Sequence, residues 1–360
     1  MNKQTDVLVV GGGFAGAAAA QKLAENGVDV TLVDKKDYFE VTFATLRNVT
    51  HPKAIGNTPR KHYKDFLKGA FIQGSIASMN DKEAKLTTGE TIRFNRAIIT
   101  TGSRYPSLPM AKSESAFDYD ARSQEMLAAH QTLASAQSVL VIGGGFVGVE
   151  FAGDIASAFP DKEVTLVHAT GTLLEQAKPK AQRKALAQLT ANGVKVLLNR
   201  KFEKDGDVYR DAQSNEMLRP DIAYMCVGMV PNTEFLQEEL SDILDSKGLI
   251  KVDSYMQVQG YENLYALGDC SNLDTSKHGY VARKQGTLLG EMLLKSAAGK
   301  QVKPYKTPSF AIITTTGTDS GVAQMPFGTL TWNFIVNLKQ KDSGIGEIYK
   351  ALGTEPDELI

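Results

Sequence analysis

Two glycine-rich loops are the stretches of this chain whose residue types and spacing most directly imply chemistry. Each follows a short apolar run, has the spacing G-x-G-x-x-G, and leads into a helical pattern rich in small residues. That combination is the fingerprint of a dinucleotide-binding unit. The fingerprint glycines are Gly11, Gly13 and Gly16 in the first copy and Gly143, Gly145 and Gly148 in the second. One copy alone is a weak signal, but two copies in the same context predict two dinucleotide sites.

Each glycine of the fingerprint has its own physical task. The first allows a tight turn, and the second lets the backbone approach a pyrophosphate that lies on the N–H groups at the start of the helix. The third lets the helix pack closely on the strand. We therefore predict that these loop residues contact bound dinucleotides: Gly11, Gly12, Gly13, Phe14, Ala15 and Gly16 in the first loop, and Gly143, Gly145, Phe146 and Gly148 in the second.

The residues that end the second strand of each unit bear on the choice of cofactor. Asp34 comes 23 residues after Gly11, where a carboxylate accepts hydrogen bonds from a ribose 2′-OH; the alternative is a surface Asp in a turn. His168 comes 25 residues after Gly143. An acid there would repel a 2′-phosphate, whereas a histidine does not, and attracts it when protonated. We predict that both NADH and NADPH are accepted; the alternative is a strand-end histidine with no role.

Composition sets bounds on function and location. The 40 Lys and Arg against 41 Asp and Glu leave a net charge of −1, so nothing marks a nucleic-acid binder. Only Cys226 and Cys270 are present and no C-x-x-C occurs, which excludes a redox-active dithiol and fits a reducing compartment. No signal peptide or bilayer-spanning run is visible, and Asn2 stands where N-myristoylation requires glycine. We expect a protein that is not secreted and is either cytoplasmic or peripheral to a membrane.

The elements around the loops predict an α/β protein built by duplication. The strand Val164–Val167 repeats the letters of Val30–Val33, so the repeat covers a whole β-α-β unit. Both halves end in an apolar strand that breaks at glycine, at Gly102 and at Gly228. A later strand ending in Gly268-Asp269, followed by a helix over 281–294, can return the chain to the first unit. Three strands over 310–316, 321–325 and 328–337 predict a small C-terminal layer.

The ordered set of motifs resembles a known family. From residue 5 to about residue 300 the chain is similar to the two-domain flavoprotein reductases of the pyridine nucleotide–disulfide oxidoreductase superfamily. Within it, several stretches resemble the apoptosis-inducing-factor-like quinone reductases and, more distantly, the type II NADH dehydrogenases. These stretches are Val33–Asp37, Leu46-Arg47, Gly144–Glu150, Pro160–His168 and Tyr265–Cys270.

The resemblance implies an α/β fold of two Rossmann-like, glutathione-reductase-like domains plus a small C-terminal α+β layer. It implies tightly bound, non-covalent FAD on the first domain and NADH or NADPH as co-substrate on the second. The expected division is 1–108 and 248–303 for the FAD-binding domain, 109–247 for the NAD(P)H-binding domain and 304–360 for the C-terminal domain.

The resemblance also carries further cofactor contacts onto residues of this chain. Asp34 would meet the FAD ribose, and Asp269 the ribityl chain and phosphate. Arg47 would lie near the flavin; the residues alone leave a solvated helix-end charge open. The remaining carried-over contacts are Ile76 at the adenine, Thr101, Gly102, Gly228, Gly268, and Ala282, which begins a helix aimed at the flavin pyrimidine edge.

The reaction that the resemblance implies is hydride transfer from NAD(P)H to flavin, followed by reduction of a ubiquinone-like quinone to quinol. Glu150, early in the helix after the second loop, is the predicted catalytic carboxylate at the nicotinamide; the alternative is a surface carboxylate near a helix end. Lys339 resembles a residue of the C-terminal stretch that reaches the active site, although most lysines in such a run are solvated.

The C-terminal stretch offers a further surface. Leu330, Trp332, Phe334, Val336 and Leu338 alternate, so they could line a quinone entrance, touch a membrane surface transiently, or pack as a sheet core. Two other functions remain open at this stage: a reductase of a small iron–sulfur protein, and a flavin-bound redox-signalling protein with slow turnover. No oligomeric state follows from the sequence.

Overall fold

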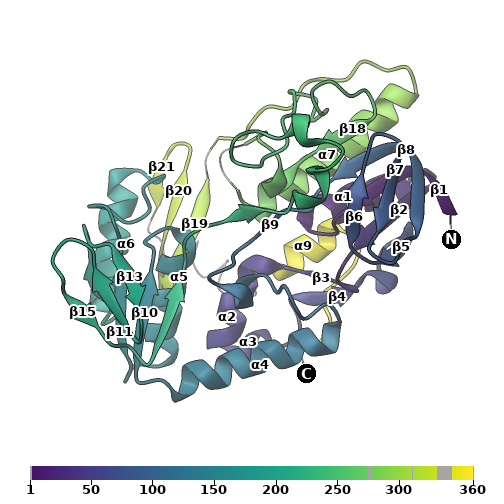
Figure 1. The fold of residues 1–360 in the computed structure, drawn as a ribbon. Helices are drawn as coiled ribbons and strands as arrows, with labels where there is room; N and C mark the ends of the chain where they lie inside the picture. Colours follow the sequence, from purple (N-terminus) through teal and green to yellow (C-terminus); the bar gives the residue numbers. More distant parts are fainter. Residues whose placement is uncertain (1, 275–276, 310, 331–342, 360) are drawn as a thin grey trace.

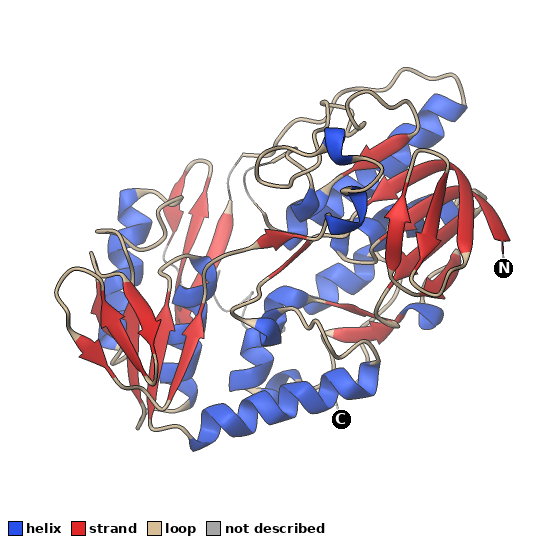
Figure 2. Ribbon diagram, in the orientation of Figure 1, coloured by secondary structure: helices blue, strands red, loops and turns tan. Residues whose placement is uncertain are grey.

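Two α/β units, each built on its own twisted sheet, make up the molecule (Figures 1 and 2). The structure is a computed structural model, which describes residues 2–274, 277–309, 311–330 and 343–359. The predicted fold class is confirmed by the mainly parallel sheets of both units and the helices that follow their strands. Among the described helices, none is long and apolar enough to cross a bilayer.

The first unit has a seven-stranded sheet in the order β5-β2-β1-β8-β7-β6, with β18 paired to β8. Its β1 is parallel to both β2 and β8. Alternate residues of β1 therefore serve two cores: Val7 and Val9 pack with the small residues of α1, and Leu8 and Val10 with the opposite layer. The elements are β1 (Asn2–Val10), α1 (Phe14–Ala24), β2 (Val30–Asp34), β5 (Ala70–Gln73), β6 (Ile76–Met79), β7 (Glu83–Leu86), β8 (Thr91–Ile99), β18 (Leu264–Ala266) and α7 (Gly279–Ala297).

The second unit repeats the central part of the first. Its four parallel strands lie in the order β12-β11-β10-β16, and a small antiparallel sheet of β13, β14 and β15 accompanies them. The elements are β10 (Ser138–Ile142), α5 (Phe146–Ala158), β11 (Glu163–Val167), α6 (Pro179–Ala191), β12 (Lys195–Leu197), β13 (Phe202–Asp205), β14 (Val208–Asp211), β15 (Met217–Leu218) and β16 (Ile222–Met225).

The third glycine of each fingerprint is required by a close approach of the helix to the loop before it. A Cβ on Gly16 would lie 1.8 Å from the carbonyl oxygen of Gly11, and a Cβ on Gly148 would lie 1.9 Å from that of Gly143. Both distances are far below van der Waals contact, so neither position can hold a larger residue while the loop keeps this shape. The duplication seen in the letters is therefore also a duplication of backbone geometry.

The chain returns to the first unit after the second is complete. β18 runs parallel to β8, and α7 packs along α1 so closely that a Cβ on Gly286 would lie 2.1 Å from the Ala15 carbonyl oxygen. A short antiparallel pair, β9 (Ser103–Arg104) with β17 (Val230–Pro231), joins the two connecting segments. The four domain ranges expected from the sequence remain our proposal.

The C-terminal segment divides between the units. The antiparallel strands β19 (Ile312–Gly317), β20 (Ser320–Met325) and β21 (Gly328–Leu330) lie against α5 and α6. Helix α9 (Ile345–Ala351) instead packs in the first unit, where Tyr349 meets the edge of Phe39. Of the alternating apolar set, Leu330 ends β21, whereas Trp332, Phe334, Val336 and Leu338, together with Lys339, lie outside the described residues.

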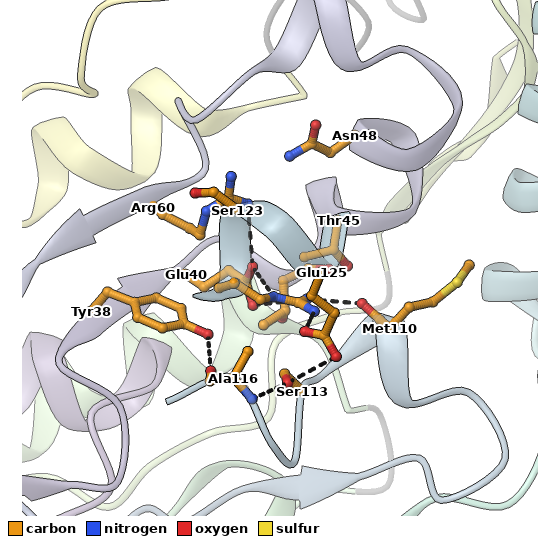
Figure 3. Close-up of polar contacts among 12 residues, drawn as sticks. Tyr38, Glu40, Thr45, Asn48, Arg60, Met110, Ser113, Ala116, Ser123 and Glu125 are labelled. Carbon is orange, nitrogen blue, oxygen red and sulfur yellow. Dashed lines mark hydrogen bonds and ion pairs between the residues drawn. The ribbon is translucent and has the colours of Figure 1, made fainter. Parts of the chain in front are cut away.

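Helix α4 (Tyr119–Ser135) links the units and is anchored by a buried charge cluster (Figure 3). It begins at Tyr119, where the Asp118 side chain accepts a hydrogen bond from the N–H of Ala121 and caps the helix. Fully buried Arg122 donates from Nε and Nη2 to the two carboxylate oxygens of Glu40, at 2.9 and 3.2 Å. Glu40 lies on β3 (Tyr38–Glu40), which pairs with β4 (Arg60–His62).

Glu40 is held ionised by the cations around it. Burial by itself would raise the pKa of this carboxyl, but Arg122, Lys36 and Arg60 together hold the pKa below its usual value. Beyond the Arg122 nitrogens, Arg60 Nη1 lies 3.6 Å and Lys36 Nζ 3.8 Å from a carboxylate oxygen of Glu40. Removing the Glu40 carboxylate would leave buried Arg60 without its ion-pair partner and Arg122 with only the partly exposed Glu125, which is more costly than losing the pair itself.

We predict that Glu40→Gln lowers the free energy of unfolding by about 3–5 kcal/mol, because it leaves buried Arg60 without its carboxylate partner and Arg122 with Glu125 alone. In the wild type the Glu40 contribution is fully present above the unfolded-state pKa of about 4.3. This contribution is lost as the pH falls through the lower pKa of Glu40 in the folded state. Denaturant unfolding across this acidic range should show a pH-dependent loss of the free energy of unfolding in the wild type. The part of that loss due to Glu40 should be absent in the variant. Glu83→Gln, which removes an exposed pair with Arg93, is the control and should cost under about 1 kcal/mol.

Candidate functional site

The first glycine loop is held by its neighbours in one conformation. The N–H of Gly11 donates to the carbonyl of Val33, and the N–H of Gly12 donates to Asp34 Oδ2 at 2.5 Å. The hydroxyl of Tyr63, buried beneath the loop, donates to the Gly12 carbonyl at 2.8 Å. Asp34 therefore ends β2 beside the loop, as a ribose-binding carboxylate must. The support from Tyr63 follows from no sequence motif.

The side of this loop that faces away from the protein fits a diphosphate. A Cβ built on Gly13 would meet no atom within 4 Å, and no side chain caps the start of α1. The first N–H groups of a helix carry partial positive charge and need an acceptor. Open backbone at Gly13 and an uncapped helix start together form the cradle that an FAD pyrophosphate requires.

The second loop has the same construction with one exchange of residue. The N–H of Gly143 donates to the carbonyl of Val167, and the N–H of Gly144 donates to His168 Nδ1 at 3.1 Å. His168 thus takes the place that Asp34 holds in the first unit. Because Nδ1 accepts this bond, the ring proton of neutral His168 lies on Nε2, which is 3.1 Å from the Thr170 hydroxyl.

The second loop is also open where a pyrophosphate would approach. A Cβ on Gly145 meets nothing within 4 Å, no side chain caps α5, and no acid lies in its first turn. Phe146, the next residue, meets the edge of the His278 ring at the start of α7. The start of α5 therefore lies beside a helix of the first unit, so the structure brings the two predicted nucleotide sites towards each other.

The two strand ends that break at glycine lie together. The Thr101 hydroxyl donates to the carbonyl of Asn232, whose side-chain amide donates back to the Thr101 carbonyl. The N–H of Asn232 also donates to the Gly102 carbonyl. Gly228, with φ of +80°, lies shortly before this junction. The sequence placed Thr101, Gly102 and Gly228 in the site but did not predict that Asn232 joins them.

Asp269 is half-buried beside a cation that the sequence analysis did not assign to the site. Its Oδ2 accepts hydrogen bonds from the Ser103 hydroxyl at 2.7 Å and from Lys112 Nζ at 2.8 Å. Burial by itself would raise the Asp269 pKa, but Lys112 and Ser103 hold it below its usual value. Lys112 was missed because it follows Pro109 in a stretch with no motif.

Gly268 and Ala282 lie against the same first unit. The N–H of Gly268 donates to Gln285 Oε1 on α7, and the Gln285 amide donates to buried Asp274. Gly268, Asp269, Ala282 and Gln285 line one small cavity at the start of α7. Ile76 begins β6, and Gly74 just before it donates its N–H to the Asp34 carbonyl. These positions are compatible with the predicted FAD contacts, which remain predictions.

Arg47 bridges the two units. It lies on α2 (Thr45–Thr50), which precedes α3 (Pro52–Ile55), and its Nη1 is 3.1 Å from Asp154 Oδ1 on α5. Only 11% of the Arg47 side chain and 5% of the Asp154 side chain are exposed. The sequence analysis left two interpretations of Arg47 open, a flavin contact or a solvated charge. Neither included an ion pair between the two units. Contact between Arg47 and FAD remains a prediction.

Glu150 also reaches another part of the chain. Its Oε1 accepts a hydrogen bond from the N–H of Thr315 on β19, at 3.1 Å. The carboxylate is half-buried at the junction of the second unit with the C-terminal strands. This position is not that of a surface carboxylate, and it gives Glu150 a structural partner beside any role at the nicotinamide.

The two cysteines are free and unsuited to thiol chemistry. Burial raises the pKa of the Cys226 thiol to about 12, and burial also raises the pKa of Cys270. Both remain protonated at neutral pH, so neither supplies the thiolate that attacks a disulfide. Within the residues that the structure describes, no group of three or more His, Cys, Asp or Glu side chains could hold a metal ion.

Comparison with known proteins identifies the construction. The family model described as "Pyridine nucleotide-disulphide oxidoreductase" matches residues 5–286. "Ferroptosis suppressor protein 1" of Xenopus tropicalis is 31% identical over 96% of this chain and 96% of its own length. "Apoptosis-inducing factor homolog A" of Dictyostelium discoideum is 24% identical over 98% of this chain and 93% of its length.

A solved structure supports the fold independently. "Structure of NDH2 from plasmodium falciparum in complex with NADH" aligns with a TM-score of 0.78 at 14% identity, over 99% of each chain. Together these matches confirm the predicted family, the fold class, and FAD with NAD(P)H as the cofactors.

We predict that alanine at the open glycine of each loop weakens the binding of one cofactor and leaves the other unaffected. Gly13 and Gly145 have φ of −66° and −74°, which alanine adopts without strain, and neither Cβ would meet protein. Gly13→Ala should lower the flavin absorbance per protein. Gly145→Ala should leave flavin content unchanged and raise the KM for NAD(P)H by about tenfold, since the added methyl occupies the pyrophosphate approach.

Thermal melting provides the control for this pair, because both variants should melt within a few degrees of the wild type. The assignment of the loops fails if Gly145→Ala loses flavin, or if Gly13→Ala changes only the KM for NAD(P)H.

Proposed function

Because the chain belongs to the pyridine nucleotide-disulphide oxidoreductases, we propose that it is an FAD-dependent NAD(P)H:quinone oxidoreductase. The observation that carries the proposal is the pairing of two intact dinucleotide loops with two free cysteines, whose thiol pKa values burial raises. The similarity to Ferroptosis suppressor protein 1 over nearly the whole chain supports it.

The overall reaction balances without any group beyond the two substrates and solvent. NAD(P)H gives up a hydride, a proton enters from water, and the quinone takes two electrons and two protons to become quinol. Bound FAD would supply the chemistry that relays the two electrons between nicotinamide and quinone. The protein has to hold both partners and control access of water.

The first unit holds FAD in this proposal through several backbone and charged groups. The start of α1 and the open backbone at Gly13 receive the pyrophosphate, and Asp34 the ribose. Ser103 and Lys112 fix the Asp269 carboxylate, which orients it towards the same bound group. The uncapped start of α7 directs partial positive charge to the site, which favours negative charge on a reduced ring.

The second unit binds and releases NAD(P)H in this proposal. The start of α5 receives its pyrophosphate, and His168 lies where the adenosine ribose would come. Since neutral His168 carries its proton on Nε2, it presents a donor rather than a carboxylate to that ribose. This arrangement does not repel a 2′-phosphate, so the proposal includes use of both NADH and NADPH.

The experiment that tests the function is an anaerobic titration of the purified flavoprotein with NADH and with NADPH, followed by a soluble short-chain ubiquinone. Either reductant should bleach the flavin absorbance, and the quinone should restore it. A Cys226→Ala/Cys270→Ala variant should keep quinone turnover within about threefold, because thiols have no part in the reaction. Bleaching without reoxidation by any quinone would contradict the proposal and favour a protein acceptor or a signalling role.

We predict that Glu150 acts through its charge and not only through its bond to Thr315. Glu150→Gln keeps an oxygen that can accept the Thr315 N–H, whereas Glu150→Ala removes it. Both variants should retain FAD and lose at least about tenfold in kcat, in the range typical of a lost acid–base group. Only the alanine variant should melt earlier. Full activity of Glu150→Gln would reduce Glu150 to a structural contact.

A further inference from the structure

Helix α6 presents a stripe of cations to solvent. Lys180, Arg183 and Lys184 are exposed and, with Ala187, follow the i, i+3, i+4, i+7 spacing of one helix face, which is shallowly concave. The opposite face packs into the second unit through Ala181, Ala185 and Leu189. The cationic stripe is thus a separate surface from the face that holds α6 in the fold.

This arrangement of charge weakens the isolated helix. Lys180 stands in the first turn, where the partial positive charge of the helix disfavours cations, and it lies one turn from Lys184. The helix contains no acid, and none of the three cations lies within ion-pair distance of an acid among the described residues. The fold therefore gains nothing from these charges, whereas an anionic surface brought against the stripe would.

An exposed aromatic side chain lies beside the stripe. Phe327 occupies the two-residue turn between β20 and β21 and is 77% exposed. The turn is held next to the start of α6, because Lys178 Nζ donates to the Pro326 carbonyl at 3.3 Å (Figure 1). Leaving a phenylalanine in water forfeits the free energy that its burial would provide, so the residue fits a turn that contacts something apolar.

We propose that the stripe on α6 and the Phe327 turn form a docking surface for a membrane that contains anionic phospholipid. The cations match the phosphate and carboxylate headgroups, and the aromatic ring at the tip of the hairpin inserts at the level of the glycerol backbone. A nucleic acid would match the charges but would leave Phe327 without a function, since one ring is no stacking platform. Binding to vesicles distinguishes a membrane from an acidic protein as the partner. The surface lies outside the dinucleotide loops, so the proposal does not depend on the acceptor being a quinone.

The test is co-sedimentation of the full-length, FAD-containing protein with vesicles. Vesicles of phosphatidylcholine alone should leave the protein in solution. Vesicles with about one third phosphatidylglycerol should bind it, and high salt should release it. Lys180→Gln/Arg183→Gln/Lys184→Gln should lower the affinity for anionic vesicles by about 100-fold, from the attraction typical of three juxtamembrane cations. Phe327→Ser should lower it by about tenfold at unchanged charge.

A matched control removes the same charge elsewhere. Lys64, Lys85 and Lys300 are exposed on other elements, and their triple Gln variant should retain vesicle affinity within about threefold. Flavin absorbance and thermal melting verify that each variant is folded. The proposal is overturned if the wild type does not prefer anionic vesicles, or if the two triple variants bind alike. It is also overturned if Phe327→Ser binds as the wild type does, which would indicate that the surface recognises anionic charge alone.

Discussion

The contact between the first and third glycines of each loop is the constraint on which both units depend. The helix after the loop can lie on its strand only if the third glycine has no Cβ, because that atom would fall within 2 Å of the first glycine's carbonyl oxygen. This close packing directs the uncapped start of each helix at the space where a pyrophosphate would lie. The other residues of the proposed sites, such as Asp34 and Asp269, lie around these two helix starts.

The same backbone is used twice with different residues at one position. In the first unit the N–H of the second glycine donates to the Asp34 carboxylate, and in the second unit it donates to the His168 ring. A charged acceptor makes a stronger bond than a neutral one, and Tyr63 adds support beneath the first loop. The more tightly held loop suits a cofactor that stays bound, and the other suits a dinucleotide that must leave after reaction.

The two units are held together by contacts that no sequence motif predicts. Arg47 pairs with Asp154 across the interface, Glu150 receives the N–H of Thr315, and Phe146 meets His278. Helix α4 is anchored in the first unit through Arg122 and Glu40 and leads directly into β10. Because a reaction between two bound nucleotides requires them to meet within a few ångströms, these contacts between the units matter as much as the loops themselves.

The sequence alone determined the two β-α-β units, their glycines, and the residues Asp34 and His168, because all of these follow from short-range patterns within one unit. It also excluded a thiol mechanism from the number and spacing of cysteines. Only the tertiary structure decided the partners of Arg47 and Glu150, the ion pair of Lys112 with Asp269, and the division of the C-terminal segment between the units. Those pairs join residues far apart in the chain, and neither helical nor strand periodicity carries information about which distant side chain a charge will meet.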